Sequence, residues 1–261
     1  MKKGFFIIFS KMIITSKNNP LIKETAALKE KKARKQLGLF LVEGVKMARE
    51  VLRSDLQTER VFVAESYANA SEFPAEKLVV VSDDVFRFLS DEKTPQGVLC
   101  RVKIPNLPLQ PPKNACLFLD GVSDPANVGA IVRTANAAGY NEIYLASDCA
   151  DPYSPKSVRA SMSGIFFTKL YIGSREEVLN VFRSTPILVA DMNGENAFKF
   201  VPPEKFVLAI GNEANGISKQ TEEAAAHVVK IPMSATQESL NAAVSAGILM
   251  YLLKKKSFER L

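Results

Sequence analysis

Three clusters of polar residues in the second half of the chain could do chemistry, and the first covers residues 120–135. Asp124 suits a helix N-cap, Pro125 suits the first helical position, and Asn127 lies in the first turn. The apolar stripe of this helix is Val128, Ile131, Val132 and Ala135. Arg133 falls outside that stripe, and its protonated guanidinium could hold a phosphate or stabilise a developing negative charge. The alternative is a capped helix with a surface arginine.

The second cluster, residues 210–218, follows an apolar strand and contains two glycines and two asparagines, which suit a tight turn. Its glycine spacing matches G-x-x-x-x-G, but Ile217 and Ser218 stand where a phosphate-binding loop needs Lys and then Ser or Thr. The pattern is not G-x-G-x-x-G either. Nucleoside triphosphate binding is therefore excluded, a dinucleotide-binding oxidoreductase is disfavoured, and the segment by itself predicts only a turn.

The third cluster, residues 231–244, places a polar loop between a strand and a long helix. Ser239 and Asn241 lie at the predicted helix start, where side chains can cap the helix or bind a ligand. Capping explains Ser239 well and Asn241 poorly. The helix also carries a stripe that permits close approach of a partner helix, and it consists of Leu240, Ala243, Val244, Gly247, Ile248 and Tyr251.

A proline-rich segment at residues 105–114 is predicted to be a stiff linker between two α/β domains. In residues 12–104, strands are predicted at 39–43, 60–64, 78–81 and 97–102, and helices at 45–52 and 83–89. In residues 115–261, strands are predicted at 115–119, 142–145, 166–170, 187–190, 206–210 and 228–231, and helices at 126–138, 174–182, 219–226 and 239–255. This alternation predicts a parallel sheet, and the three clusters lie at the carboxyl ends of its strands, where such sheets bind ligands.

The net charge of +6 is concentrated at the N-terminal end of the chain. Residues 1–60 contain 14 Lys and Arg against 6 Asp and Glu. Residues 12–38 have few large apolar positions and are predicted to form an exposed basic arm or helix. Such a block suits contact with a phosphate backbone or an anionic membrane, and the alternative is a solvated helix face.

The few cysteines and histidines exclude several classes of site. The three cysteines are far apart and show no C-x-x-C spacing, so they are predicted to be reduced thiols, buried or partly buried, in a cytosolic protein. The one histidine, His227, excludes zinc sites with two or more His ligands, and we expect it to have a structural role. We therefore expect no metal site and a cytoplasmic protein.

The start of the chain resembles a signal peptide, but its apolar core is shorter than the roughly 7–15 residues such peptides need. No small-residue cleavage site follows, and no stretch approaches the roughly 20 apolar residues of a membrane span. We expect residues 1–11 to be a disordered leader, or Met12 to be the true start.

Together, the three clusters resemble the signature motifs of the SpoU/TrmH family of RNA ribose 2′-O-methyltransferases. In order, the motifs are Asn127-Val128-Gly129-x-x-x-Arg133-Thr134-Ala135, Gly211-Asn212-Glu213-x-x-Gly216-Ile217, and Ile231-Pro232-Met233 leading to Ser239-Leu240-Asn241. The resemblance covers roughly residues 113–255, with a weaker match over residues 12–104. It implies a SPOUT domain with a deep trefoil knot, a homodimer formed through this domain, and a preceding substrate-binding domain similar to ribosomal protein L30e.

The resemblance also implies a cofactor, S-adenosylmethionine, and a role for each site residue. The residues expected to carry catalysis are Arg133, Asn127, Glu213, Ser239 and Asn241. The residues expected to bind the cofactor are Gly211, Ile231, Leu240, Ala190, Asn212 and Met233. Arg133 is placed at the ribose hydroxyl, either as a general base with a strongly depressed pKa or as an electrostatic stabiliser of the oxygen.

The expected substrate is ribosomal RNA of the large subunit (23S), with transfer RNA as the alternative. A non-catalytic RNA-binding protein is the competing class. Two positions depart from the family pattern, because Ala235 stands where glycine is usual and Ala242 where a bulkier aliphatic residue is usual. Ala235 would be strained if the loop required a positive φ.

Overall fold

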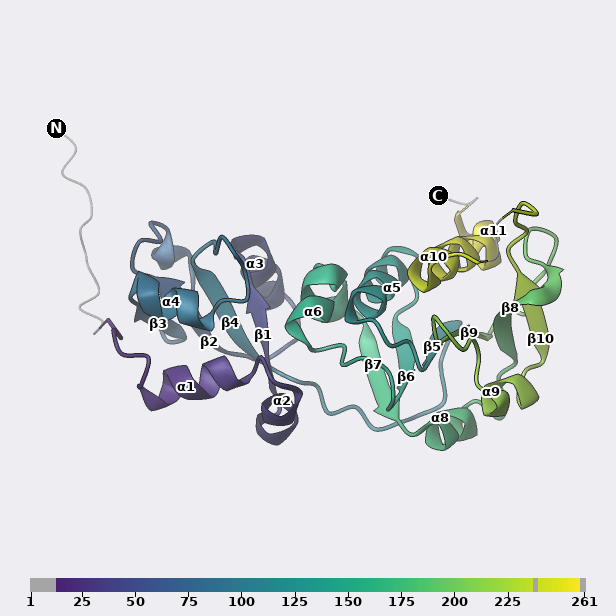
Figure 1. The fold of residues 1–261 in the computed structure, drawn as a ribbon, viewed down its shortest axis with the longest axis horizontal. Helices are drawn as coiled ribbons and strands as arrows, with labels where there is room; N and C mark the ends of the chain where they lie inside the picture. The colour runs from purple at the N-terminus through teal and green to yellow at the C-terminus, as the bar shows by residue number, and fades with distance from the viewer. Residues whose placement is uncertain (1–12, 237–238, 259–261) are drawn as a thin grey trace. The chain divides into compact units, whose positions relative to one another are not determined.

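The computed structural model describes residues 13–236 and 239–258, so the leader expected at residues 1–11 and the alternative start at Met12 lie outside the described residues. The chain divides after Ile104 into two compact units (Figure 1). No helix among the described residues is long and apolar enough to cross a membrane. The same residues contain no group of three His, Cys, Asp or Glu side chains that could hold a metal ion.

The N-terminal unit is built on a mixed four-stranded sheet of order β1-β4-β2-β3, in which only the β2–β3 pair is parallel. Its elements are α1 (Pro20–Ala27), α2 (Lys31–Leu37), β1 (Leu39–Glu43), α3 (Val45–Arg53), β2 (Thr58–Ala64), a short 3-10 helix (Ala70–Glu72), β3 (Leu78–Val81), α4 (Asp83–Leu89) and β4 (Val98–Lys103). The four predicted strands and two predicted helices of this region are all present, with small shifts at their ends.

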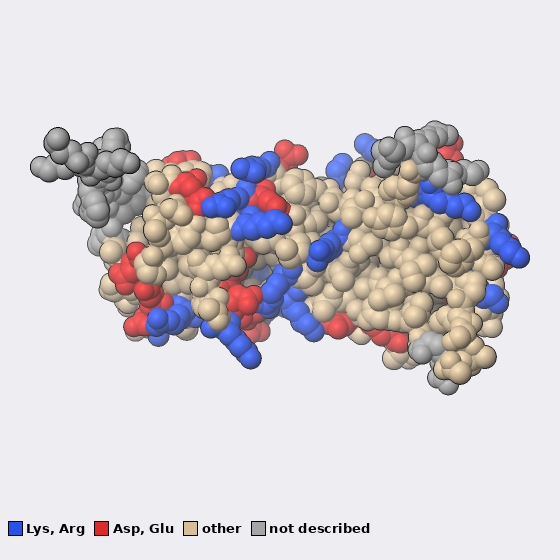
Figure 2. All heavy atoms as spheres, turned by 90° about the horizontal axis from the view of Figure 1, so that it is seen from above, with Lys and Arg blue, Asp and Glu red and all other residues tan. Residues whose placement is uncertain are grey.

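The segment expected to be an exposed basic arm or helix is helical and mostly exposed, but a few of its side chains are buried. Ile22 and Leu28 are fully buried in the core of the unit because α1 packs against it. Arg34 is also buried and donates from Nη1 to the carbonyl oxygens of Leu28 and Lys29, at 2.8 and 2.7 Å. Helix α2 keeps three exposed lysines, Lys31, Lys32 and Lys35. On the face drawn in Figure 2, basic side chains of the N-terminal unit alternate with acidic ones.

The C-terminal unit is built on a fully parallel six-stranded sheet of order β10-β8-β9-β5-β6-β7. Its elements are β5 (Cys116–Asp120), α5 (Pro125–Ala137), β6 (Glu142–Ala146), α6 (Pro155–Ser161), α7 (Gly164–Phe167), β7 (Lys169–Gly173), α8 (Arg175–Val181), β8 (Ile187–Asn196), β9 (Val207–Gly211), α9 (Lys219–Glu223), β10 (His227–Lys230), α10 (Ala242–Leu253) and α11 (Lys255–Phe258). The predicted α/β class with a parallel sheet is confirmed, and the knot and the likeness to L30e stay predictions.

The sheet order places the carboxyl ends of β5 and β9 side by side. The chain leaves β5 toward β6 and β7 on one side and later returns through β8 and β9 on the other. The register pairs Asp120, the last residue of β5, with Gly211, the last residue of β9. A reversal of strand order of this kind leaves a crevice at the carboxyl edge of the sheet. The first two polar clusters therefore meet there.

Four predicted elements differ from the structure, and one of them is the helix expected at residues 219–226, because α9 ends at Glu223. The apolar run at residues 166–170 was expected to be a strand, but its first part belongs to the short helix α7 and the strand β7 begins at Lys169. A short apolar run does not by itself distinguish a strand from a buried helical turn. Strand β8 continues to Asn196, because its second half pairs with the end of β10. Helix α10 begins at Ala242 rather than at residue 239.

The three cysteines are buried and free, as expected. His227 lies at the start of β10, where its ring makes an edge contact with Phe200 at 5.3 Å between ring centroids. Its Nδ1 also lies 3.9 Å from a carboxylate oxygen of Glu195. These contacts support the structural role that we expected for the histidine.

Candidate active site

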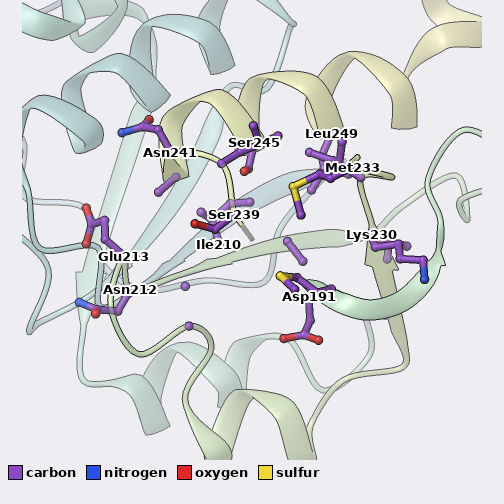
Figure 3. Close-up of a pocket in the computed structure, with 18 of the residues that line it drawn as sticks. Asp191, Ile210, Asn212, Glu213, Lys230, Met233, Ser239, Asn241, Ser245 and Leu249 are labelled. Carbon is purple, nitrogen blue, oxygen red and sulfur yellow. The ribbon is translucent and has the colours of Figure 1, made fainter. Parts of the chain in front are cut away.

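A pocket of about 530 Å³ opens beside the middle of β8, the carboxyl ends of β9 and β10, and the start of α10. It is lined by residues 190–192, 210–214, 216, 229–231, 233, 239–242, 245 and 249. In Figure 3, Glu213 and Asn241 lie at one end of the pocket and Asp191 and Lys230 at the other. The volume falls in the range of about 300–1,000 Å³ that is typical of small-molecule sites.

All six residues expected to bind the cofactor line this pocket, although they come from four separate segments of the chain. Each of the six is half-buried, so it offers surface to a ligand while its backbone is held by the fold. These residues are Ala190, Gly211, Asn212, Ile231, Met233 and Leu240.

Position 211 must be glycine, because its backbone lies directly against that of Gly216 at the pocket wall. A Cβ added at this position would lie 2.3 Å from the carbonyl carbon of Gly216, a distance that real side chains do not adopt. Two backbone hydrogen bonds hold the turn closed. The N–H of Asn212 donates to the carbonyl of Gly216 at 2.8 Å, and the N–H of Gly216 donates to the carbonyl of Asn212 at 2.9 Å. The loop is therefore a tight turn, as its glycines and asparagines predicted.

Glu213 is the centre of a hydrogen-bond network that joins the first two clusters. One carboxylate oxygen accepts from the N–H and hydroxyl of Ser123, at 3.0 and 2.8 Å. The other accepts from the N–H of Asp124 at 3.2 Å and from Nδ2 of Asn127 at 2.8 Å. Partial burial alone would raise the pKa of Glu213, but the hydrogen bonds from Asn127 and Ser123 outweigh it and lower the pKa to about 2. Glu213 is therefore ionised at neutral pH and suited to orienting its neighbours.

Asn127 and Asn241 extend this network to the third cluster. Nδ2 of Asn241 donates to Oδ1 of Asn127 at 3.0 Å, and Asn127 is nearly buried. The Oδ1 atom of Asn241 accepts from the N–H groups of Ala243 and Val244, so Asn241 is the N-cap of α10. Capping was the alternative that suited Ser239 better than Asn241, and the structure reverses this, because Asn241 is the residue that caps the helix. Ser239 lies two residues before the cap and lines the pocket instead.

The structure does not bring Arg133 into this network. Its side chain is exposed on α5, does not line the pocket, and has no hydrogen-bond or ion-pair partner among residues 13–236 and 239–258. Gly164 packs against the helix directly at this point, since a Cβ added there would lie 3.0 Å from Cα of Arg133. The guanidinium is thus held on a fixed helix and left open to solvent. Four of the five residues expected to carry catalysis lie together, and the fifth lies apart.

The sequence analysis assigned no role to Asp120, although it anchors the same loop. The Asp120 side chain is fully buried at the end of β5 and pairs with Nε of Arg175, and its Oδ2 atom accepts from the N–H of Ser218 at 2.8 Å. Burial alone would raise the pKa of Asp120, but the hydrogen bonds from Arg175 and Ser218 lower it. A carboxylate at the end of a buried strand was the signal that could have identified it.

The departure at Ala235 causes no backbone strain. Among the described residues, Met162 is the one non-glycine residue with a positive φ, at 49°, so the loop holds Ala235 in an ordinary conformation. Ala242 is the first residue of α10 and lines the pocket, where its small side chain leaves room.

Comparison with protein families identifies both units. Residues 114–251 match the SpoU rRNA Methylase family, and residues 19–100 match the MRM3-like substrate binding domain. The first match covers more than half of the chain. The chain therefore belongs to the SpoU rRNA methylase family of RNA 2′-O-methyltransferases.

Similar proteins and structures match over nearly the whole chain. The 23S rRNA (guanosine(2553)-2′-O)-methyltransferase RlmP of Bacillus subtilis is 28% identical over 92% of this chain and 98% of its own length. The 23S rRNA (uridine(2479)-2′-O)-methyltransferase of Streptomyces viridochromogenes is 28% identical over 91% of this chain and 90% of its own length. The AdoMet-bound rRNA methyltransferase of Sinorhizobium meliloti superposes with a TM-score of 0.85 at 25% identity, over 94% and 98% of the two chains. The crystal structure of an RNA 2′-O ribose methyltransferase superposes with a TM-score of 0.80 at 30% sequence identity, over 95% of this chain and 100% of the other.

Proposed function

We propose that this S-adenosylmethionine-dependent RNA ribose 2′-O-methyltransferase acts on ribosomal RNA of the large subunit. The observation that carries the proposal is the pocket at the carboxyl edge of the sheet, where Glu213 and Asn241 line one end and are both hydrogen-bonded to Asn127. The relatives RlmP and the uridine(2479) enzyme, which match over at least nine-tenths of both chains, are named for 23S rRNA. This supports large-subunit RNA over transfer RNA as the substrate.

The residues of the pocket fit S-adenosylmethionine. Ile210 and Leu249 supply apolar surface for a ring, and the missing side chain of Gly211 lets the turn at the pocket wall close against Gly216. Asp191 brings a carboxylate to the far end of the pocket, where it could face a cationic group. When bound, S-adenosylmethionine supplies an electrophilic methyl group, so much of the acceleration can come from positioning.

The proposed catalytic residues fall into two groups: those held in place by hydrogen bonds, and the exposed Arg133. Glu213 accepts four hydrogen bonds and has a pKa near 2, so it holds Asn127 and the residue 123–124 backbone in place rather than removing a proton. Asn241 joins this group to the start of α10, and Ser239 lies two residues before Asn241 in the preceding loop. Arg133 is exposed and can bind the RNA, where its guanidinium would stabilise negative charge on the 2′-oxygen and hold the adjacent phosphate.

The enzyme is further proposed to act as a homodimer through its C-terminal unit. Val244 and Tyr251 lie two helical turns apart on α10 and are 50% and 44% exposed, while the opposite face of the helix is buried by the chain itself. A second copy covering this face would remove the exposed apolar surface from water. Sedimentation should give twice the chain mass of 28.7 kDa. Val244→Asp should shift the protein to monomer, whereas Val201→Asp, a change at another exposed valine, should not.

The test of the function is methyl transfer from radiolabelled S-adenosylmethionine to RNA that lacks the modification, with ribosomal and transfer RNA separated afterwards. Label in large-subunit RNA, at one ribose that resists alkaline cleavage, is the expected result. Label in transfer RNA would overturn the proposed substrate and keep the chemistry. Cofactor binding without label would require repetition with assembled ribosomal particles, and label in none of these substrates would refute the proposal.

A further inference from the structure

The N-terminal unit contains a second cavity, of about 220 Å³, that the proposed chemistry does not use. It lies between the carboxyl end of β2, the first turns of α4 and the loop before β4. The lining residues are Ala64, Ser66, Tyr67, Asp83, Phe86, Arg87, Pro95, Gln96 and Gly97. The cavity is smaller than the roughly 300 Å³ at which drug-sized sites begin, so it suits a single flat ring system.

Two polar groups at the cavity wall are only half satisfied. Asp83 accepts from the hydroxyl of Ser66 through Oδ1 at 2.7 Å, and Oδ2 has no hydrogen-bond partner within the described part of the chain. Gln96 accepts from the N–H of Val45 through Oε1 at 3.0 Å, which leaves its amide NH₂ group without a partner in those same residues. The wall therefore offers one acceptor and one pair of donors to a ligand.

The remaining wall is partly aromatic. Tyr67 lines the cavity, and its ring contacts that of Phe73, with 6.2 Å between ring centroids. The Arg87 guanidinium pairs with Asp84 at 2.8 Å, and the side chain is 69% exposed, so the flat face of the guanidinium could still stack on a ring. The Asp83 carboxylate in the wall repels phosphate, whereas it can accept a hydrogen bond from an N–H group of a heterocycle. Aromatic faces combined with an acceptor and a donor match the chemistry of a nucleobase.

The cavity is also held in shape by the backbone around it. Gly97 has a φ of 81°, and its carbonyl accepts from the N–H of Ala64 at 2.9 Å. A Cβ added at Gly97 would lie 3.4 Å from Cβ of Tyr67, so the loop lies directly against the tyrosine. The start of the same loop is fixed by Glu43, which accepts from the N–H of Asp91 at 3.0 Å. A preformed site loses little entropy when it binds a ligand.

We propose that this cavity binds one unpaired nucleobase of the RNA substrate, with Asp83 and Gln96 contacting the base edge and Tyr67 contacting its face. The proposal rests on the proposed function, since it requires that the substrate be RNA. Sequence-specific recognition of RNA commonly uses single-stranded regions whose bases are splayed out of the stack. The N-terminal unit would then read a base as well as bind the phosphate backbone.

The test compares two charge-matched variants of the full-length protein, Asp83→Asn and Asp55→Asn. Binding to an in vitro transcript of large-subunit ribosomal RNA is measured by filter binding at fixed salt. Each change removes one negative charge, which by itself favours binding to a polyanion. Asn at 83 can still accept from Ser66. We expect about tenfold weaker binding for Asp83→Asn, because the hydrogen bond to the base edge is removed, and equal or tighter binding for Asp55→Asn.

A second pair separates the ring of Tyr67 from its hydroxyl group, which bonds to Glu72. Tyr67→Ala should weaken binding by about tenfold because the stacking surface is removed, and Tyr67→Phe should bind like the wild type. Melting temperature and S-adenosylmethionine affinity are measured for each variant to confirm that it is folded. If the wild type binds and methylates the transcript while Asp83→Asn and Tyr67→Ala bind it as well as the wild type does, the cavity is a structural crevice and the proposal is wrong. Failure of the wild type to bind the transcript, transfer RNA or assembled ribosomal particles would instead refute the proposed function.

Discussion

Arg133 is the one proposed catalytic residue that lies outside both the pocket and the hydrogen-bond network around Glu213. It lies exposed on α5, outside the pocket, so its removal should leave cofactor binding intact. We expect Arg133→Ala to reduce single-turnover methyl transfer by about 100-fold or more, because a charged donor at the developing oxyanion would be removed. Arg183→Ala removes another arginine of the same unit and should retain activity. Near-normal turnover of Arg133→Ala would remove this residue from the mechanism.

Glu213 should make the stability of the C-terminal unit depend on pH at the acid end. Its folded pKa of about 2 lies below the ordinary value of 4.5, so the stabilising effect of the carboxylate is fully present above pH 4.5. As the pH falls from about 4.5 to about 2, the folded carboxylate becomes protonated and this effect is lost. The melting temperature of Glu213→Gln should therefore lie below that of the wild type at pH 7 and approach it in acid.

The control for this prediction is Glu204→Gln, which changes an exposed carboxylate of the same unit outside the network. It should show no such convergence of melting temperatures. A constant difference between Glu213→Gln and the wild type across this pH range would show that the carboxylate charge does not stabilise the loop.

Among the structural elements, the tight turn after β9 shapes the pocket that we propose binds the cofactor. Gly211→Ala should weaken S-adenosylmethionine binding by about tenfold or more, because the new Cβ would lie 2.3 Å from Gly216 and the turn must move. Gly247→Ala is the matched control. A Cβ there meets Thr134 at an ordinary 3.5 Å, and alanine favours the helix, so binding should be retained. Calorimetric titration of the cofactor measures both, and equal affinities would contradict this account of the turn.

At the scale of the whole molecule, the charge distribution should govern RNA affinity. Replacing Lys31, Lys32 and Lys35 on α2 with alanine should weaken binding at low salt and lower the slope of log Kd against log salt, by about 1 for each RNA phosphate that is no longer neutralised. The charge-matched control replaces exposed lysines of the C-terminal unit, namely Lys169, Lys199 and Lys219. If both triple variants lower the slope equally, the basic block at the N-terminal end has no special part in binding.

Much of the fold could be predicted because it depends on local chemistry. Apolar runs predicted nearly all the strands, and Asp124 and Pro125 predicted the start of α5, where Asp124 accepts from the N–H of Ala126. The exceptions were decided by tertiary packing. Residues 166–167 are helical beside α5, and Arg34 is buried because it caps the end of α1. Neither arrangement is visible in the hydropathy of the residues involved.

The residue types at the carboxyl ends of the strands could be read from the sequence, and its motifs indicated the family. The tertiary structure was needed to show which of these residues meet. Asn127 reaches Glu213 and Asn241 across 86 and 114 positions of the chain, because the strand order brings β5 and β9 together and α10 begins beside them. It also decided that Asn241 caps α10 and that Arg133 is exposed outside the pocket. Local propensity follows from near neighbours in sequence, whereas hydrogen-bond partners at a site follow from the order of strands in the sheet.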